Sequence, residues 1–579
     1  MKTKRASAAF VAILFLAAAS VQAVVAQDSA KPNKISHVLL VSIDGMHVVD
    51  YLNCSKGVKG INGGQPYCTN LAKLGATAVN YLDTSTSRPS DSFPGLMAIV
   101  TGGTPRTFGA FYDVAYDRVL APPLKTTGNG LKGGSCTLNR ANGTSTEYEE
   151  GIDINQQFLN GIDGISTKNG DGGINSIDPA RLERDPFNNC LPVYPWNFIR
   201  TNTIFGVIHA AGGYTAWSDK HPAYSSVSGP GDGTNLDDFY APEINSMVVA
   251  LKGVRTPLGL ACDPIPDPKA DLSAWTNSFE NIQCYDTLKV NAILNEIDGF
   301  SHNRKKKAQV PTIFGMNFQA VSVGQKLIEA NVGSGGYLNG MGTPSALLLQ
   351  EIQFVDAAIG KWTAELRKQG LSDSTLVIIT AKHGQSPIDS PRYVGITSSG
   401  PVTTSPSRLI DDCLPPSESN SGGQIGPTED DVSLLWLKRS CNTATEVGIL
   451  ETQSPTSNNI AGISEIFFGQ SINQLFNPPG IPPNGDPRSP DIIVTPNVGV
   501  TYSGSTAKQA EHGGFSHDDT NVMILISNPS FASKTLTTPV QTAQVAPTIL
   551  KALGLNPGRL QAVQIQGTEV LPGVFSGKK

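Results

Sequence analysis

The fold of this chain is decided by the stretch Leu376-Val377-Ile378-Ile379-Thr380-Ala381-Lys382-His383-Gly384. Its first six residues carry no charge and predict a buried strand that delivers Lys382 and His383 at its carboxyl end. A helix is expected before this strand, because apolar residues recur at helical spacing from Leu347 to Leu366 and Gly370 then ends the pattern. A helix that leads into a buried strand is the repeating unit of a mainly parallel α/β sheet.

A second short apolar run, His37 to Ile43, closes with Asp44 and predicts another buried strand. Ligands of open α/β sheets bind at the carboxyl ends of the strands, so Asp44 and His383 are expected to lie near each other. Further strands are predicted at Thr312 to Phe318, Ser433 to Leu437, Asp491 to Thr495 and Asn521 to Ser527. The sequence therefore predicts an α/β sandwich around a mainly parallel sheet.

Composition places the chain among globular proteins with long irregular connections. It has 579 residues, 39% of them hydrophobic, with 59 glycines and 40 prolines, so it can bury a large core. Two stretches, near residues 120–195 and 385–430, are rich in Gly, Asn, Ser and Pro and are expected to be loop insertions that wall a pocket. The sequence contains no repeat and no boundary of a second core, so residues 27–579 are predicted to form one domain.

The first 26 residues predict a secretory signal peptide. Met1 to Arg5 is basic, Ala8 to Ala19 is apolar, and small residues near Ala23 and Ala26 suit a cleavage site. The apolar stretch is short for a membrane span, and no later run reaches the roughly 20 apolar residues that a spanning helix needs. The mature protein is therefore expected outside the cell or in the periplasm, without a membrane span.

The eight cysteines are an even number in a chain expected to be exported, which predicts disulfides rather than a thiolate metal site. Pairing in sequence order would join Cys54 with Cys68, Cys136 with Cys190, Cys262 with Cys284 and Cys413 with Cys441, although the sequence leaves other connectivities open. The formal net charge of -6 gives no electrostatic reason to expect nucleic acid as a partner. The oligomeric state is not indicated by the sequence.

Asp44 and Ser92 are the first two candidates for a reactive site. A carboxylate at a strand end, followed by a glycine, is well placed to bind a divalent cation, and the competing interpretation is a loop cap. Ser92 lies just before Phe93, Pro94 and the apolar segment Leu96 to Val100. A hydroxyl at the amino terminus of a helix meets free amides and the positive end of the dipole, which favour a phosphate or an oxyanion. A serine at that position is, however, ordinarily an N-cap.

Histidines supply the next candidates. Two of the chain's eight histidines lie within the nine residues 511–519, together with three acids. Histidine nitrogen and carboxylate oxygen are ordinary ligands of a catalytic zinc. We therefore take His383, His512, His517 and Asp518 as candidate metal ligands, and a polar capping loop is the alternative for the last three.

Lys220 and His221 are candidates for substrate binding. They follow Trp217 in the stretch Trp217 to Tyr224. An aromatic ring, a cation and an imidazole together suit a phosphate or sugar ligand. The alternative is an ordinary strand and turn.

In their order along the chain, these residues resemble the type I phosphodiesterase and nucleotide pyrophosphatase family of the alkaline phosphatase superfamily. Asp44 matches the family's first metal aspartate, and Ser92 falls where the family has its threonine or serine nucleophile. His383 matches the histidine of the Asp-His-Gly with which a buried strand ends in the family, and His512 matches its late metal histidine. The resemblance implies an alkaline-phosphatase-like three-layer sandwich with a mainly parallel central sheet and disulfide-stapled insertions.

The chain departs from the family's pattern at three metal-ligand positions. Lys382 stands in place of the aspartate before His383, and Val321 and Gln325 stand where the family has the aspartate and histidine of its second zinc. Three of the six protein ligands that the resemblance implies, apart from the nucleophile, are thus replaced. One divalent ion, in the family zinc, is expected rather than two, unless His517 or Asp518 substitutes.

The resemblance implies a metal-dependent hydrolase of small phosphoric esters in which Ser92 attacks phosphorus. The ammonium of Lys382 is expected to supply a fixed positive charge where the family holds a cation, which makes Lys382 a catalytic candidate. Two alternatives stay open. One is a binding protein that kept the fold and lost hydrolysis, and the other is a hydrolase of sulfate esters or phosphonates on the same scaffold.

Overall fold

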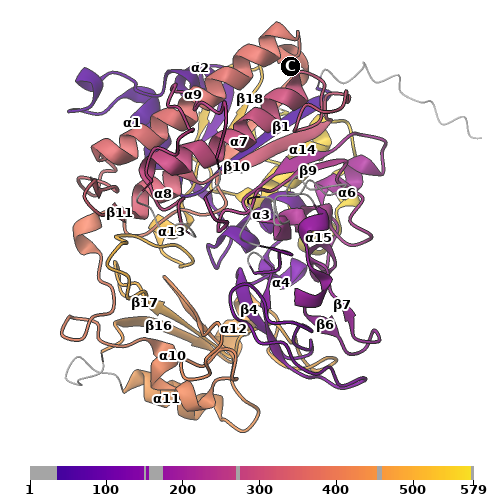
Figure 1. Cartoon of the computed structure of the whole chain (residues 1–579), viewed down its shortest axis with the longest axis vertical. Helices are drawn as coiled ribbons and strands as arrows, with labels where there is room; N and C mark the ends of the chain where they lie inside the picture. The colour runs from indigo at the N-terminus through magenta and orange to yellow at the C-terminus, as the bar shows by residue number, and fades with distance from the viewer. Residues whose placement is uncertain are drawn as a thin grey trace, which may run out of the picture. The chain divides into compact units, whose positions relative to one another are not determined.

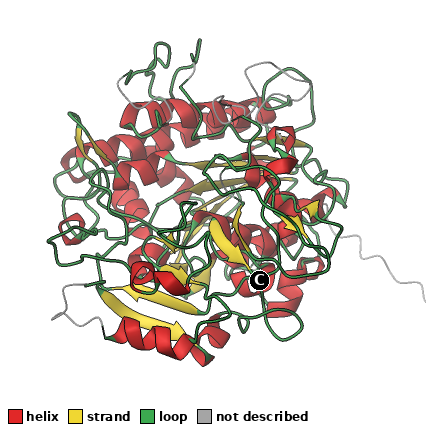
Figure 2. Ribbon diagram, turned by 60° about the horizontal axis from the view of Figure 1, so that its bottom comes forward, coloured by secondary structure: helices red, strands yellow, loops and turns green. Residues whose placement is uncertain are grey.

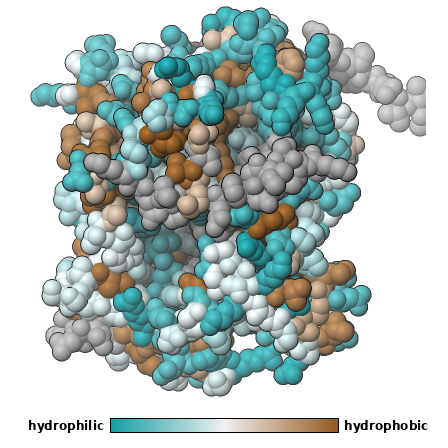
Figure 3. All heavy atoms as spheres, viewed as in Figure 1, coloured by the Kyte–Doolittle hydropathy of each residue, from teal (hydrophilic) through white to brown (hydrophobic). Residues whose placement is uncertain are grey.

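The computed structural model describes residues 35–575, apart from 149–150, 156–158, 160–173, 249, 269–273 and 453–459. The predicted signal peptide, residues 1–26, lies outside the described residues, as does part of the first predicted insertion. In the part of the chain that is described, no helix combines the length and the apolar character needed to cross a membrane. On the face drawn in Figure 3, hydrophilic and hydrophobic residues alternate over short distances.

A central sheet of eight strands organises the fold, in the order β19-β2-β18-β13-β1-β10-β8-β9 (Figure 1). Strands β13, β1, β10, β8 and β9 run parallel to their neighbours, whereas β18 is antiparallel to both β13 and β2. The strands are β1 (His37–Ile43), β2 (Ala78–Tyr81), β8 (Ala216–Ser218), β9 (Asp238–Tyr240), β10 (Ile313–Phe318), β13 (Thr375–Thr380), β18 (Ile524–Ser527) and β19 (Lys534–Leu536). The predicted α/β class with a mainly parallel central sheet is confirmed.

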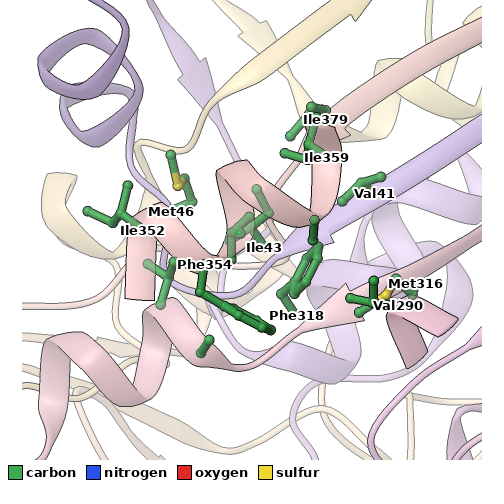
Figure 4. Packing of buried hydrophobic residues seen from close by; sticks show 14 of the residues in the cluster. Val41, Ile43, Met46, Val290, Met316, Phe318, Ile352, Phe354, Ile359 and Ile379 are labelled. Atoms are coloured by element: carbon green, nitrogen blue, oxygen red, sulfur yellow. The ribbon is translucent and has the colours of Figure 1, made fainter. Parts of the chain in front are cut away.

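Helices cover both faces of this sheet and make it the middle of three layers. Side chains alternate along β1, so that Leu39 and Val41 join one hydrophobic cluster while Val38 and Leu40 join the other. The first cluster includes α7 (Phe279–Ile297), α8 (Ala320–Lys326) and α9 (Ala346–Lys368), and the second includes α3 (Ser92–Thr101), α6 (Ile204–His209) and α14 (Val545–Ala552). Figure 4 shows part of the first cluster, where Phe318 of β10 lies beside Phe354 of α9.

The unit that decides the fold in the sequence is found as predicted. α9 begins after Ser345, whose side chain accepts a hydrogen bond from the Leu348 amide, and the chain turns at Gly370 with a φ of 72°. β13 follows and is buried along its whole length. Its register pairs Ser42 of β1 with Thr380, so the residues that follow these two strands lie at the same edge of the sheet.

The predicted strands at 433–437 and 491–495 also exist, but they lie outside the central sheet. They belong to a separate antiparallel sheet made of β14 (Thr428–Glu429), β15 (Ser433–Leu435), β16 (Ile463–Phe468) and β17 (Ile492–Pro496). Figure 2 shows these strands beside short helices, which are α10 (Pro406–Leu409), α11 (Thr443–Glu451) and α12 (Gln470–Leu475). A buried apolar run indicates a strand but does not indicate which sheet it joins.

Short elements make up the remaining connections. The helices are α1 (Val48–Lys56), α2 (Thr69–Gly75), α4 (Pro105–Phe108), α5 (Pro195–Phe198), α13 (His517–Thr520) and α15 (Gln561–Gln566). The strands are β3 (Thr84–Ser85), β4 (Val114–Asp117), β5 (Thr144–Glu147), β6 (Arg184–Asp185), β7 (Leu191–Pro192), β11 (Ile328–Glu329), β12 (Gly333–Ser334) and β20 (Val540–Gln541).

Three of the four cysteine pairs taken in sequence order are disulfides. They join Cys136 with Cys190, Cys262 with Cys284, and Cys413 with Cys441. The expected fourth disulfide is wrong, because Cys54 and Cys68 are buried free thiols. The Cys54 thiol instead contacts the carbonyl of Tyr51 at 3.7 Å. Burial raises the pKa of the Cys54 thiol, which disfavours the reactive thiolate.

Candidate active site

The candidate site lies where four neighbouring strands of the central sheet end. Asp44 follows β1, His383 follows β13, Gln319 follows β10 and Lys220 follows β8. Parallel strands present their carboxyl ends at one edge, so residues far apart in sequence meet there. The chain turns sharply after Asp44, since Gly45 has a φ of 82° and a side chain there would collide with Gln325.

Asp44 is buried and holds a charge. Its Oδ2 accepts hydrogen bonds from Asn317 Nδ2 at 3.0 Å and from Gln319 Nε2 at 2.6 Å, and its Oδ1 has no hydrogen-bond partner. Burial acts to raise the pKa of Asp44, but Lys382 and His383 outweigh it and hold that pKa well below its ordinary value. Oδ1 is thus a charged oxygen that is free to bind a cation.

Ser92 is the first residue of α3 and is fully buried. Its hydroxyl has two neighbours, because Lys220 Nζ donates to Ser92 Oγ at 3.1 Å and His383 Nε2 lies 3.2 Å from the same oxygen. His383 Nδ1 is 2.7 Å from the carbonyl of Gly384, which accepts its proton. That hydrogen bond places a proton on Nδ1, and Nε2 is directed toward Ser92.

The sequence predicted free backbone amides at the start of the helix at Ser92, but the structure shows that they are not free. Asp91 caps α3 by accepting from the Phe93 amide at 3.2 Å, Pro94 has no amide proton, and the Gly95 amide donates to the Asp91 carbonyl. These groups are therefore not free donors for a phosphate. Positive charge at this position comes from lysine side chains together with the helix dipole.

Lys382 is the residue whose surroundings differ most from the expectation. Its Nζ donates to both carboxylate oxygens of Asp219, at 2.9 and 3.1 Å, and lies 3.9 Å from the centre of the Tyr224 ring. Both partners of this ion pair are fully buried. The expectation of an ammonium that faces the reacting groups is met by Lys220 instead, because the partner Asp219 neutralises Lys382 and holds it in place.

His512 lies against His383, with their ring centroids 3.9 Å apart. Its Nδ1 is 3.5 Å from Asp91 Oδ1. Burial and then the neighbouring His383 lower the pKa of His512 well below its ordinary value, so its imidazole is neutral. His512 therefore joins the site as a neutral ring beside His383.

The other candidates lie away from these groups. The His517 side chain is 80% exposed and starts the short helix α13. Asp518 caps another loop through a 2.9 Å bond from the Ile388 amide, and His221 is directed to Glu243 at 2.8 Å. The expected substitution of a missing metal ligand by His517 or Asp518 is therefore not seen, because their side chains have other surroundings.

The positions that would hold a second ion are occupied by structural residues. Val321 is fully buried in the hydrophobic cluster under α9. Gln325 donates to the Gly45 carbonyl at 2.8 Å and to the Tyr337 hydroxyl at 2.7 Å. Among the described residues, the only three metal-binding side chains with ligand atoms within 4.8 Å of one another are Cys413, Cys441 and Glu446, and those cysteines form a disulfide. A second ion does not fit these residues.

One divalent ion does fit the retained groups. His383 Nε2 is 3.2 Å from Ser92 Oγ and 3.6 Å from Asp44 Oδ2. Metal bonds of zinc length place neighbouring ligand atoms of a tetrahedron about 3.4 Å apart, which agrees with these separations. The unpartnered Asp44 Oδ1 adds a charged ligand. Three protein ligands with one open position are the usual composition of a catalytic site for a single ion.

Reasoning from the sequence missed four residues that shape the site. Asn317 and Gln319 orient Asp44, Asp219 pairs with Lys382, and Asp91 caps α3. The sequence signal for Gln319 was its place directly after the strand predicted at Thr312 to Phe318. It also lies two residues before Val321, one of the positions where the family has a metal ligand. Asp219 had no such signal, since its pairing with Lys382 depends on two strands that are not neighbours in the sheet.

Comparison with protein families gives one match. The model of the family described as type I phosphodiesterase / nucleotide pyrophosphatase matches residues 291–404. This segment contains β10, α9, β13 and His383. No curated protein matches the chain.

Comparison with solved structures extends the likeness to most of the chain. The alkaline phosphatase PafA is 13% identical with a TM-score of 0.51, and the match covers 91% of this chain and 97% of that one. Murine ectonucleotide pyrophosphatase / phosphodiesterase 5 is 12% identical with a TM-score of 0.47, covering 90% and 96%. Phosphonoacetate hydrolase from Sinorhizobium meliloti 1021 is 13% identical with a TM-score of 0.45, covering 90% and 96%.

The expected class of enzyme, a phosphodiesterase or phosphatase-type hydrolase, agrees with the family whose model matches residues 291–404. At 13% identity the likeness to PafA supports the fold, and the family match covers the segment around His383. The resemblance to the type I phosphodiesterase and nucleotide pyrophosphatase family is thereby confirmed over residues 291–404.

Proposed function

We propose that this protein hydrolyses small phosphoric esters with Ser92 as the nucleophile. One observation carries the proposal: Lys220 and His383 both lie within hydrogen-bonding distance of the buried Ser92 hydroxyl. A hydroxyl placed between a cation and an unprotonated imidazole nitrogen is the arrangement that activates a serine. Random loss of function would not keep Asp44, Ser92 and His383 converging on one point.

The chemistry assigned to the chain's own groups has two steps. Ser92 Oγ forms a bond to phosphorus while the bond from phosphorus to the leaving oxygen breaks, which gives a phosphoserine and an alcohol or a phosphate-bearing product. Water then attacks the phosphorus and Ser92 is released. The Nε2 lone pair of His383 faces Ser92 and is the group placed to receive its proton in the ion-free protein.

Lys220 is the group placed to stabilise negative charge in this reaction. Its ammonium donates to Ser92 Oγ, so it favours the deprotonated oxygen and lies beside the position of the phosphoryl group. A fixed positive charge in a buried site counts for more than the same charge in water. We assign to Lys382 the different task of holding Asp219 and keeping Asp44 ionised.

The single ion proposed above would be held by Asp44, Ser92 and His383. When bound, a divalent ion, zinc by analogy with the family, supplies the Lewis acidity that makes the serine hydroxyl acidic at neutral pH. Lys220 and Lys382 bring two further positive charges close to Asp44. These charges oppose the binding of a second ion, in keeping with the loss of its ligands at Val321 and Gln325.

The proposed substrate is a small phosphodiester or phosphomonoester, and the proposed location is outside the cell or in the periplasm. Support for export comes from the signal-like first 26 residues and from three disulfides. Residues 27–579 are proposed as one hydrolase domain. A sulfatase, a phosphonate hydrolase and a binding protein without turnover are the outcomes against which the proposal is tested.

The test is to look for the phosphoserine directly. The protein is mixed with bis(4-nitrophenyl) phosphate or 4-nitrophenyl phosphate, quenched in acid and digested. The mass of the peptide that contains Ser92 is then measured by mass spectrometry. We expect a phosphoryl adduct on Ser92, no adduct and no turnover in Ser92→Ala, and normal turnover in Ser87→Ala, a nearby buried serine that bonds the Pro89 carbonyl. Unchanged turnover in Ser92→Ala would exclude the proposal.

A substrate panel separates the alternatives. Turnover of 4-nitrophenyl sulfate or of a phosphonate in preference to both phosphate esters would assign the protein to those reaction classes. Binding of a nucleotide without turnover of any ester, with metal content confirmed by elemental analysis, would assign it as a binding protein.

A further inference from the structure

A cavity lies outside the candidate active site, between the small sheet and the loop that leads into α13. It has a volume of about 210 Å³, and its lining includes Ser386, Asp431, Thr495, Ser516 and Asp519. Asp431 lies in the turn between β14 and β15, whereas Asp519 lies in α13, so two loops distant in sequence bring two aspartates together. The small sheet and the segment around α13 thus both contribute to this cavity.

The two aspartates are buried without the groups that usually compensate a carboxylate. Asp431 is 3% exposed and neither of its oxygens has a hydrogen-bond partner. Asp519 is 1% exposed, and its Oδ1 also has none, while its Oδ2 accepts from the Ser516 hydroxyl at 2.7 Å. In the described part of the chain no lysine, arginine or histidine forms an ion pair with either carboxylate.

Nearby charges do not resolve this arrangement. Lys508, which precedes the segment that contains Asp519, is paired with Glu511. Burial and then the charge of Asp519 raise the pKa of Asp431 well above its ordinary value, and burial raises the pKa of Asp519 to about 7. Two like charges at close range in a buried site cannot both persist, so either a shared proton or a bound cation must compensate them.

We propose that Asp431 and Asp519 form a binding site for one calcium ion, separate from the active site. Three carboxylate oxygens of these two lining residues are buried without a hydrogen-bond partner, and the hydroxyl-bearing residues Ser386, Ser516 and Thr495 also line the cavity. Ligands that are all oxygen suit a hard cation, and calcium accepts irregular geometry with six to eight oxygens, some of them from water. The cavity has room for the ion and for such waters.

The site is placed to fix the loops that carry the active-site histidines. The Asp519 carbonyl accepts from the Gly384 amide at 2.6 Å, directly after His383. The Asp431 amide donates to the His512 carbonyl at 3.3 Å. An ion that joins Asp431 to Asp519 would therefore join the backbone beside His383 to the backbone of His512.

The test measures calcium binding and unfolding, so its result does not depend on catalysis. The full chain is stripped with a chelator, dialysed and titrated with calcium chloride in a calorimeter, and its melting temperature is recorded with and without calcium. We expect calcium to bind and to raise the melting temperature. Asp431→Asn and Asp519→Asn should each weaken calcium binding by about 100-fold or more, since each removes a direct charged ligand.

Two control variants locate the site. Asp83→Asn changes an exposed aspartate and should bind calcium like the parent protein. Asp44→Asn alters the candidate active site and should also keep this calcium site, which distinguishes failure of this inference from failure of the proposed hydrolysis.

Comparing the melting temperatures of the variant and the parent protein, with chelator and with calcium, distinguishes loss of the calcium site from poor folding. In the presence of chelator, Asp431→Asn should melt at or above the temperature of the parent protein, because it removes a buried like-charge pair and adds an amide that can donate to Asp519. In calcium the order should reverse. Absence of any calcium effect on the parent protein, unchanged calcium binding in both Asn variants, or a response to magnesium but not to calcium would overturn the assignment.

Discussion

The two halves of the candidate site differ in the residues that they contain. In the half beside β1 and β13, Ser92 Oγ lies 3.2 Å and Asp44 Oδ2 lies 3.6 Å from the shared His383 nitrogen. In the half beside β10 and α8, Val321 is part of the hydrophobic core and Gln325 bonds to backbone and tyrosine groups. The first half gathers polar groups around Ser92, and the second is occupied by packing and structural hydrogen bonds.

The difference shows how lysine side chains can supply positive charge where a divalent ion is not held. A site that loses a divalent ion must find other positive charge for the phosphoryl group, and lysine is the side chain that supplies it as a compact point charge. Here Lys220 reaches Ser92 directly, while Lys382 is held by Asp219. Two lysines near one metal position therefore have separate tasks, one at the nucleophile and one in the interior.

The sharpest test of the comparison replaces, in turn, His383, which contacts Ser92, and His512, which lies against the His383 ring. His383→Ala should lower kcat/KM for a nitrophenyl phosphodiester by about 10³-fold or more, because it removes the only imidazole within reach of Ser92 in the described structure. His512→Ala should cost no more than about 10-fold, since the other ligands of a second ion are gone. Equal losses in the two variants would break the comparison.

The buried ion pair gives the next largest effect, and it concerns stability. Lys382→Met should lower the free energy of unfolding by about 3–5 kcal/mol, because it leaves the Asp219 carboxylate buried without its partner. Urea unfolding followed by fluorescence measures this loss. The double variant Lys382→Met/Asp219→Asn should recover most of it, and a double variant as unstable as the single one would show that the charge of Asp219 is not the cause.

Lys220 should show the opposite pattern, with a loss of rate and little loss of stability. Lys220→Met should lower kcat by about 10- to 100-fold, since it removes the charge-assisted hydrogen bond to Ser92. Lys252→Met, at an exposed lysine, is the matched control and should behave like the parent protein. A kcat unchanged by Lys220→Met, with only KM raised, would return Lys220 to the substrate-binding role expected from sequence.

The smallest effect is expected in the half that has become structural. Gln325→Ala should cost about 1–2 kcal/mol of stability through the lost hydrogen bonds to Gly45 and Tyr337, with the metal content unchanged. Elemental analysis should find at most one divalent ion bound at the candidate active site, and Asp44→Asn should lose it. A loss of bound metal in Gln325→Ala would contradict the division of the site into two halves.

Much of the fold could be predicted because its signals are local. The strand at His37–Ile43 and the helix that precedes β13 are visible as apolar periodicity with clear stop residues. The strands Ser433–Leu435 and Ile492–Pro496 were also visible, but their place in a separate sheet was not. Sheet membership depends on long-range pairing, which a local pattern does not contain.

For the candidate site, the sequence by itself determined the residue types: an aspartate and a histidine at strand ends, a serine at a helix start, and a lysine where the family has an acid. Only the tertiary structure decided the partners. It joined Lys382 to Asp219 and Lys220 to Ser92, and it separated His517 from the site. Charge pairing depends on distance in space, and residues more than a hundred positions apart acquire that distance only when parallel strands bring their ends to one edge.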